Sequence, residues 1–473
     1  MQRAERFGKI QIESIFIGTA GGQQRQHNGP QHGERQQGGE RDGETHGLPG
    51  YPADMLFTPL QLGPCTVANR VWLPAMVTWL SNDEGEVTPE IRARYVRYAQ
   101  GAPGMIVLEA MGIRDIASGP LLRISHDRYV PALRELVTEM RRECAQRNGS
   151  DSGGALKIVP QIIDFLKIAR RDPERSLARL AQRYPGCERW DEAQLQATLT
   201  PREWRDYAYG YRQQIEDLTV GEIEALPGHF AAAAVRAQNA GFDGVELHFA
   251  HAYTMSSLLS ATNARTDHYG GTFENRLRSP LAVIAAVRAA VGADFAVGLR
   301  MLGSDDVPGG TTIDEAAQFA VAFARAGVDF ISVSRGGRFE DAARPAVGKA
   351  AYPYTGQSGL LCMPTHSFPE GYSLPLPRAI RAAVREAGFQ TPIIGAGRIN
   401  SAEVAEAALH AGDLDLVGMA RGLLADPDWA LKASGKLAEP IRACKYTNAC
   451  EALDRAHLPV RCQLWWKQGM NAP

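Results

Sequence analysis

Short apolar segments alternate with longer amphipathic segments along most of the chain, and this alternation constrains its fold more than any other feature. Eight apolar segments read as buried strands: Val71–Leu73, Met105–Leu108, Ile158–Ile163, Val245–Leu247, Phe295–Arg300, Phe330–Val333, Pro392–Ile394 and Leu414–Val417. Between them lie runs with helical spacing, such as Tyr129–Cys144, Ile223–Asn239, Leu277–Val291 and Ile313–Ala326. Eight strand–helix units predict an α/β fold, a (β/α)8 TIM barrel. The periodicity alone leaves a doubly wound sheet open.

Composition narrows the classes of protein that fit. The chain has 473 residues, long enough for one large domain or two small domains, and its 44% hydrophobic and 22% charged residues suit a soluble globule. A formal net charge of −2 gives no support for a nucleic-acid partner. The sequence contains no apolar run of the ~20 residues that a membrane helix needs. Seven scattered cysteines argue against a disulfide framework, so we expect a cytoplasmic protein.

The chain divides into three expected parts. Gly21–Gly50 is dominated by Gln, Gly, His, Arg and Glu, with almost no apolar residues, so we expect residues 1–54 to form a disordered tail. Residues 55–440 form the barrel, and residues 441–473 form a C-terminal extension. Two insertions, Phe165–Asp217 and Ala343–Pro375, follow expected strands and should lie at the barrel mouth. The first suits a lid or a dimerising subdomain equally well, and the second favours a lid.

Residues 241–278 contain the closest grouping of side chains that could take part in catalysis. The strand Val245–Leu247 runs into His248, and His251 and Tyr253 follow within six residues. In a parallel barrel the C-terminal ends of the strands form the active-site face. Imidazole N–H groups can hold a carbonyl oxygen and a phenol can supply a proton. A single histidine at a strand end is more often structural, but two histidines and a tyrosine together favour a catalytic site.

Two glycine-containing loops predict a phosphate site. Gly395-Ala396-Gly397-Arg398 follows the seventh expected strand and Gly418-Met419-Ala420-Arg421 follows the eighth. TIM barrels commonly bind phosphate at these two loops through backbone N–H groups. Arg421 is the better candidate for the phosphate itself, because its planar fork matches phosphate oxygens. Arg300 ends the fifth strand, where its charge would point into the barrel mouth. A buried charge is costly without a partner, so we expect Arg300 to bind an anionic part of a ligand; a structural ion pair within the protein is the alternative.

The pattern HxxHxY followed by TNxRxDxYGGxxENRxR resembles the Old Yellow Enzyme family of FMN-dependent ene-reductases and NADH:flavin oxidoreductases. The resemblance extends, more weakly, from about Met55 to about Leu464. It implies an FMN enzyme that takes hydride from NADH or NADPH and passes it to an activated alkene. It also implies that His248 and His251 hold the acceptor oxygen and that Tyr253 protonates the α-carbon.

The resemblance assigns flavin contacts to further residues. It places Arg300 beside flavin N1 and Gln161 on the pyrimidine edge. The remaining expected cofactor residues are Pro74, Ala75, Met76, Val77, Ala110, Gly397, Arg398, Ala420 and Arg421. The chain departs from the family at Val77, where many members carry a Thr or Cys that adjusts the flavin potential. Ala252 also replaces the usual glycine between His251 and Tyr253.

The C-terminal extension resembles the segment that holds a 4Fe–4S cluster in larger members, such as dienoyl-CoA reductases. Cys444, Cys450 and Cys462 match that segment, but Thr447 stands where the second cysteine belongs. Because such clusters normally take four thiolates, we expect neither a cluster nor another metal. A three-ligand cluster and a zinc site with His457 are the alternatives. The chain is expected to match only the barrel part of those reductases.

We therefore expect a flavin oxidoreductase whose partner is a small-molecule electron acceptor, with no nucleic acid and no membrane. Two rivals remain: a phosphate-binding TIM-barrel lyase or aldolase, and a flavin-binding protein without turnover. The sequence leaves open the acceptor, the choice between NADH and NADPH, and whether the protein is a homo-oligomer.

Overall fold

The computed structural model describes residues 54–115, 119–149, 155–166, 177, 180–208, 214–345 and 352–466. Residues 1–53, which hold nearly all of the expected tail, lie outside the described residues, as do residues 467–473. Among the described residues we find no helix with both the length and the apolar character that crossing a bilayer requires.

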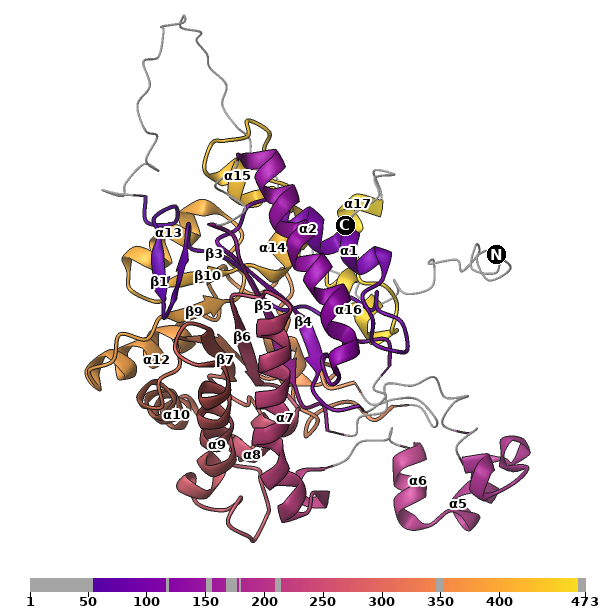
Figure 1. The fold of residues 1–473 in the computed structure, drawn as a ribbon. Coiled ribbons are helices and arrows are strands. Elements are labelled where there is room, and N and C mark those ends of the chain that lie inside the picture. The colour runs from indigo at the N-terminus through magenta and orange to yellow at the C-terminus, as the bar shows by residue number, and fades with distance from the viewer. Residues whose placement is uncertain are drawn as a thin grey trace, which may run out of the picture. The chain divides into compact units, whose positions relative to one another are not determined.

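Eight parallel strands close into a barrel in the order β10-β3-β4-β5-β6-β7-β8-β9 (Figure 1). They are β3 (Val71–Leu73), β4 (Met105–Gly112), β5 (Lys157–Ile163), β6 (Gly244–Phe249), β7 (Ala296–Leu302), β8 (Phe330–Ser334), β9 (Ile393–Ala396) and β10 (Leu416–Gly418). The last strand pairs with both β9 and β3, since Val417 lies opposite Gly395 on one side and Val71 on the other. The predicted TIM barrel is confirmed, and an open doubly wound sheet is excluded.

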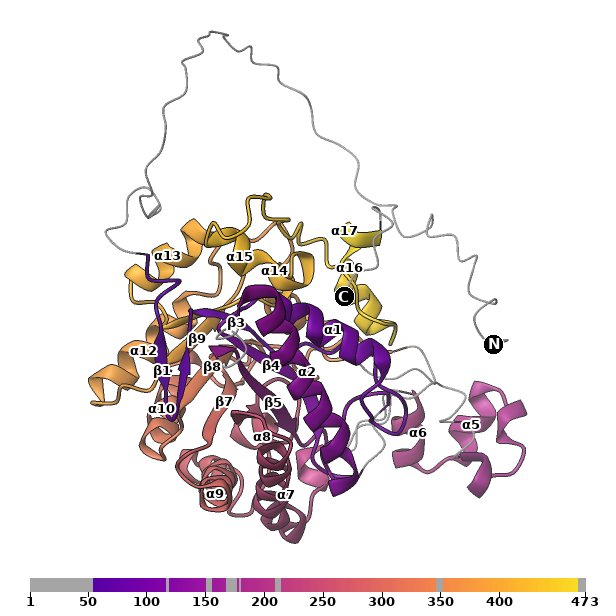
Figure 2. The ribbon, with the colours of Figure 1, turned by 45° about the horizontal axis from the view of Figure 1, so that its top comes forward.

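Helices surround the strands, as Figures 1 and 2 show for α1, α2, α7, α9, α10 and α12. The helices are α1 (Pro89–Gln100), α2 (Val130–Asn148), α5 (Glu192–Thr198), α6 (Pro201–Ala208), α7 (Val220–Asn239), α8 (Thr254–Leu259), α9 (Phe273–Val291), α10 (Ile313–Arg325), α11 (Gln357–Cys362), α12 (Pro375–Glu386), α13 (Ala402–His410), α14 (Ala420–Ala425), α15 (Trp429–Ala433), α16 (Ala449–Arg455) and α17 (Gln463–Trp466).

Local sequence explains where the helices begin. A capping box begins α7: the Thr219 side chain accepts from the backbone N–H of Glu222, and the Glu222 carboxylate accepts from the backbone N–H of Thr219. Thr272 caps α9 with one such bond, because its side chain accepts from the backbone N–H of Asn275. Each cap satisfies backbone donors that the first turn of a helix leaves unpaired.

The barrel interior is packed with side chains from alternating strand positions. Trp72, Val107, Phe330 and other apolar residues form this inner cluster. Close packing also dictates a glycine at position 298 of β7, where a Cβ atom would lie 2.1 Å from the ring of Phe330. The centre of the barrel is therefore a core, and room for a ligand exists only beyond it.

A short hairpin, β1 (Leu60–Leu62) with β2 (Cys65–Val67), lies in the segment before the first barrel strand. Leu62 and Val67 are completely buried and pack against the inner cluster of the barrel. The sequence analysis did not predict this hairpin. It adds apolar side chains to the barrel core from outside the eight-stranded sheet.

The two insertions differ in what they contact. The described part of the first contains α5 and α6, which bury a small apolar cluster of their own around Cys187, Leu195 and Leu199. The second contains α11, and its Tyr354, Cys362 and Met363 line the same cavity as the strand ends. The second insertion thus lies at the barrel mouth as expected; whether either insertion moves as a lid stays a prediction.

Candidate active site

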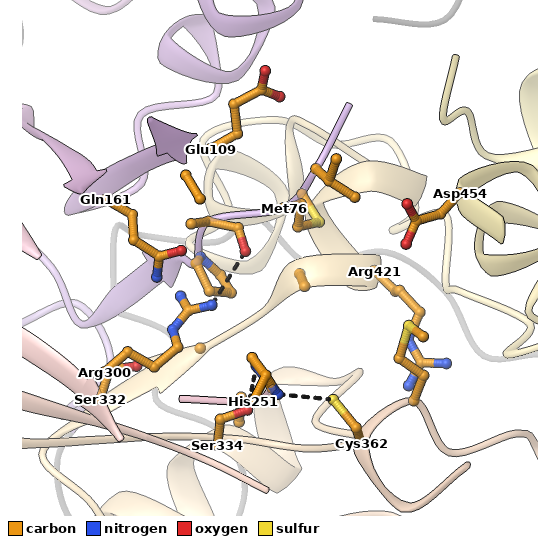
Figure 3. A pocket seen from close by; sticks show the side chains of 18 of the residues that line it. Met76, Glu109, Gln161, His251, Arg300, Ser332, Ser334, Cys362, Arg421 and Asp454 are labelled. Atoms are coloured by element: carbon orange, nitrogen blue, oxygen red, sulfur yellow. Dashed lines mark hydrogen bonds between the residues drawn. The ribbon is translucent and has the colours of Figure 1, made fainter. Parts of the chain in front are cut away.

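One cavity lies beyond the C-terminal ends of the barrel strands, with a volume of about 280 Å³ (Figure 3). All of the candidate residues named from the sequence line it: Pro74, Ala75, Met76, Val77, Ala110, Gln161, His248, His251, Tyr253, Arg300, Gly397, Arg398, Ala420 and Arg421. They come from the ends of β3, β4, β5, β6, β7, β9 and β10, or from the loops that follow. The structure therefore brings the candidate residues together; their roles remain predictions.

His248 is the last residue but one of β6, so it lies inside the strand rather than just beyond it. Its Nδ1 accepts the backbone N–H of Ala250 at 3.3 Å. A neutral imidazole with an accepting Nδ1 carries its proton on Nε2. His248 therefore has the tautomer whose Nε2–H can donate a hydrogen bond.

His251 has the opposite tautomer. Its Nδ1 lies 3.0 Å from the carbonyl oxygen of Gly336, and because a carbonyl can only accept, Nδ1 must carry the proton. Its Nε2 lies 3.3 Å from the Ser334 hydroxyl, which then donates to it. Burial lowers the pKa of His251 to about 4, and the charges of Arg300 and Arg338 add to this effect. His251 is therefore neutral near pH 7 with both ring nitrogens engaged.

Arg338 supports the backbone of His251, which adopts an unusual φ of +60°. The guanidinium is only 2% exposed, and its Nη1 donates to the His251 carbonyl at 2.9 Å and to the Ser256 hydroxyl at 3.0 Å. Its Nη2 donates to Glu340 at 2.5 Å, and Asp305 lies 3.7 Å from Nη1. Sequence reasoning missed Arg338, because nothing in its local pattern points to a residue 87 positions earlier.

Tyr253 is the N-cap residue of α8 and is almost fully buried. Its ring packs edge-on against Phe165, with ring centroids 5.5 Å apart, and lies 5.3 Å from the ring of His248. These contacts fix the ring at the cavity wall beside the imidazole that can donate. The arrangement places a proton donor next to a hydrogen-bond donor, which is what polarisation and protonation of one acceptor would need.

Arg300 and Gln161 lie side by side on the cavity wall, as Figure 3 shows. Arg300 donates from Nη1 to the carbonyl oxygen of Ala75 at 3.2 Å, which ties β7 to the segment after β3. Both residues also contact a carboxylate that the sequence analysis did not single out, Glu246. Val77 also lines the cavity and presents only an apolar side chain; its departure from the family stays a prediction.

The glycine loops after β9 and β10 form the opposite wall. Gly397 has a φ of +127°, and a Cβ atom there would lie 2.4 Å from the Cβ of Ser373, so only glycine fits. Arg398 and Arg421 lie on the ring of Tyr446, 4.4 and 4.7 Å from its centroid. Tyr446 thus packs against both arginines, although the sequence analysis did not select it.

The two arginines also bind the second insertion. Arg421 donates from Nη1 to the carbonyl oxygen of Pro364 at 2.7 Å and to Asn448 at 2.6 Å. Arg398 donates to the carbonyl oxygen of His366 at 2.8 Å. Among the described residues, Arg398 Nε is buried without a hydrogen-bond acceptor, and Arg300 Nη2 has only the ion-pair contact with Glu246 at 3.2 Å. Guanidinium groups on opposite walls of the cavity fit a ligand with a phosphate at one end and an electron-rich ring edge at the other.

The cysteine segment has three free thiols among the described residues, one fewer than the four that an iron–sulfur cluster normally takes, and the absence of a cluster stays a prediction. Cys444, Cys450, Cys462 and Thr447 line a small second cavity of about 20 Å³, roughly the space for one water molecule. The Thr447 hydroxyl accepts a hydrogen bond from Gln463 at 2.5 Å. Burial raises the pKa of all three thiols, in the case of Cys450 to about 11.

His457, the fourth ligand in the zinc alternative, packs against an aromatic ring. The ring of His457 stacks on Trp79 with a centroid separation of 4.4 Å. In the part of the chain that the structure describes, no three His, Cys, Asp or Glu side chains are grouped so that they could hold a metal ion.

The C-terminal extension contributes an acidic wall to the main cavity through Glu451 and Asp454 of α16. Asp454 accepts from Trp79 Nε1 at 2.7 Å and from the Tyr352 hydroxyl at 2.5 Å. It joins the extension to the segment after β3 and to the second insertion. These residues are far apart in sequence, so local patterns gave no signal that they meet.

Comparison with known proteins identifies the family. The model of the NADH:flavin oxidoreductase / NADH oxidase family matches residues 190–439. An NADPH dehydrogenase from Geobacillus sp. (strain WCH70) is 31% identical over 82% of this chain and 96% of its own length. The chain belongs to the NADH:flavin oxidoreductase / NADH oxidase family, and the resemblance inferred from its motifs is confirmed.

Other relatives are longer. An NADH oxidase from Thermoanaerobacter brockii is 31% identical over 83% of this chain but only 52% of its own length. A metal reductase from Desulforamulus reducens is 32% identical over 88% of this chain and 54% of its own length. The chain thus spans about half the length of these relatives.

Solved structures agree on the fold. A structure of 2-naphthoyl-CoA reductase matches 86% of this chain and 56% of its own, with a TM-score of 0.67 and 22% identity. Morphinone reductase matches 80% of this chain and 90% of its own, with a TM-score of 0.54 and 23% identity. At this level of identity the likeness establishes the barrel and nothing about substrates.

Proposed function

We propose that the chain is an FMN-dependent oxidoreductase that passes hydride from NADH or NADPH to an activated alkene of the enone type. The observation that carries the proposal is the single cavity that combines His248, Tyr253 and Arg300 with the glycine loops after β9 and β10. Family membership supports the flavin and the nicotinamide donor. Bound FMN would supply the hydride transfer itself.

The residues of the chain have distinct tasks in this proposal. Arg421, Arg398 and the loop at Gly397 would hold the phosphate, and Arg300 with Gln161 would hold the pyrimidine edge. His248 would donate its Nε2–H to the carbonyl oxygen of the alkene, which withdraws electron density from the β-carbon. Tyr253 would give its phenolic proton to the α-carbon.

His251 contributes differently from His248. Its Nε2 accepts from Ser334, so it can donate to an acceptor oxygen only after it gains a second proton or changes tautomer. The low pKa makes the doubly protonated form costly near pH 7. We therefore propose His248 as the principal donor and His251 as the residue that shapes the site beside it.

The rival functions fit the cavity less well. A Schiff-base aldolase needs a lysine in its site, and no lysine lines the described wall of this cavity. A flavin-binding protein without turnover does not need a histidine whose Nε2 carries a proton beside a buried phenol, and His248 and Tyr253 form such a pair. Both rivals stay testable by the same experiment.

The acidic wall favours a second candidate substrate class. Glu451 and Asp454 would attract a cationic amine, and one relative is named as an N,N-dimethylglycine/sarcosine dehydrogenase. Anaerobic mixing of the oxidised protein with N-methyl amines would test this candidate. Bleaching of the flavin by the amine, without NADH or NADPH, would favour it over alkene reduction.

The main proposal predicts a yellow protein that releases FMN rather than FAD on denaturation. His248→Ala should retain FMN and reduce enones about 10²–10³ times more slowly, the usual loss for one donor to a developing oxyanion. His229→Ala, on the exposed surface of α7, is the matched control and should be unchanged. A colourless protein that gains no flavin absorbance when FMN is added would refute the proposal.

A further inference from the structure

Glu246 is a buried carboxylate in β6, between the two strands that carry the residues of the expected pyrimidine site. It is 0% exposed and lies opposite Gln161 of β5 in the strand register. Its Oε1 accepts from Gln161 Nε2 at 2.6 Å and lies 3.2 Å from Arg300 Nη2. One oxygen therefore contacts both Gln161 and Arg300.

The contact with Gln161 fixes an orientation. An ionised carboxylate has no proton to donate, so both of its oxygens act only as acceptors. The amide nitrogen of Gln161 must therefore face Glu246. The amide carbonyl then points away from Glu246 and remains available as an acceptor at the cavity wall. A flavin pyrimidine presents an N–H on the edge expected there, and that group needs such an acceptor.

Stability alone does not explain this carboxylate. Burying a carboxylate costs several kcal/mol, and an ion pair with a buried arginine often does no more than offset that cost. The second oxygen, Oε2, has no hydrogen-bond partner among the described residues, so the pair is incompletely satisfied. Burial raises the pKa of Glu246, and Arg300 and Gln161 oppose this rise.

The charge of Glu246 also bears on Arg300. An uncompensated guanidinium beside a flavin stabilises the negative charge that reduction places on the ring, and so raises the reduction potential. A carboxylate 3.2 Å from that guanidinium offsets part of its field. Because the contact is buried, solvent and salt screen it only weakly.

We infer that Glu246 is a positioning residue that orients the Gln161 amide, holds the Arg300 guanidinium and lowers the reduction potential of the bound flavin. The inference rests on the proposed function, because it assumes that FMN occupies the cavity. In this inference the charge of Glu246 adjusts the reduction potential of the flavin, and Val77 takes no part.

The test is the reduction potential of the flavin in Glu246→Gln, which keeps the shape of the side chain and removes its charge. We expect the potential to become more positive. Equivalently, the ratio of affinities for reduced over oxidised FMN should rise by about 10-fold or more, as expected for loss of one nearby buried charge. Dye-coupled redox titration measures the potential, and FMN titration of the apoprotein measures the affinity.

Two further variants separate this role from a structural one. Glu406→Gln changes another carboxylate with 0% exposure, which accepts from the backbone N–H of Leu56 at 2.7 Å and does not line the cavity. It should lose stability without a change in potential. Glu246→Asp keeps the charge and should leave the potential closer to the wild-type value than Glu246→Gln does. If Glu246→Gln does not fold, the potential of Glu246→Asp and its affinity for FMN decide the question.

Two outcomes would overturn the inference, and they are distinguishable. A wild-type protein that binds no FMN would refute the proposed function and this role together. If the wild-type protein binds FMN, two results would refute the role of Glu246 alone. One is a reduction potential in Glu246→Gln equal to that of the wild type. The other is a reduction potential in Glu246→Asp that shifts as far as in Glu246→Gln.

Discussion

Replacing Arg338 with methionine should cost the protein about 3–5 kcal/mol of unfolding free energy, the usual cost of breaking a buried ion pair from one side. The guanidinium is 2% exposed and lies 3.7 Å from Asp305, which is itself 3% exposed. Methionine fills a similar volume but leaves Asp305 without its cationic neighbour and the His251 carbonyl without its donor. Domains of ordinary stability have about 5–15 kcal/mol in total, so the effect should be large.

Urea unfolding at pH 7 measures this cost from the shift of the midpoint at constant slope. Arg92→Met is the matched control, because Arg92 pairs with Glu139 at 2.6 Å and Glu135 at 3.2 Å but is 32% exposed. An exposed pair of this kind contributes about 0.2–1 kcal/mol. A loss below about 1 kcal/mol in Arg338→Met would show that the buried network around His251 is not held by Arg338.

Three further predictions concern the site. Tyr253→Phe should leave flavin reduction by NADH or NADPH unchanged and slow enone reduction about 10²-fold, which stopped-flow measurement of the two half-reactions can check; equal slowing of both would place Tyr253 in positioning instead. The pKa of His251 is about 4 in the folded protein and about 6.5 in the unfolded chain. The free energy of unfolding should therefore keep its full value above pH 6.5 and fall by about 3 kcal/mol as the pH drops to 4, because the unfolded chain binds the proton more readily. Unfolding at several pH values should show a shallower fall in His251→Asn, and equal slopes would contradict the assignment. Anaerobically purified protein should contain no stoichiometric iron, since Thr447 replaces a thiolate, and metal analysis would reveal a cluster held by three cysteines.

The sequence predicted most of the barrel, because each strand carries its own apolar signal and strand–helix alternation leaves few alternatives. It placed strand ends less well: β6 continues to Phe249, so His248 lies within the strand. It missed the β1–β2 hairpin, which forms a separate two-stranded sheet and is not part of the strand–helix alternation.

The same contrast holds at the site. His248, His251 and Tyr253 are close in sequence, so their grouping was visible in one segment. The different tautomers of the two histidines were not, because they depend on Ala250 and on Gly336, whose carbonyl lies 85 positions away. Glu246 was part of the same segment, but its contacts with Gln161 and Arg300 exist only after three strands assemble.

The pairing of β10 with β3 has a consequence for synthesis of the chain. Arg70, just before β3, binds the backbone of Asp415 across 345 positions of sequence. At a ribosomal rate of about 5–20 residues per second, β3 therefore waits roughly 20–70 seconds for the strand that covers its free edge. During that time the nascent barrel presents an unpaired parallel edge, which is a site for aggregation. Expression at slow elongation rates should thus depend on chaperones that shield this edge until Leu416–Gly418 has left the ribosome.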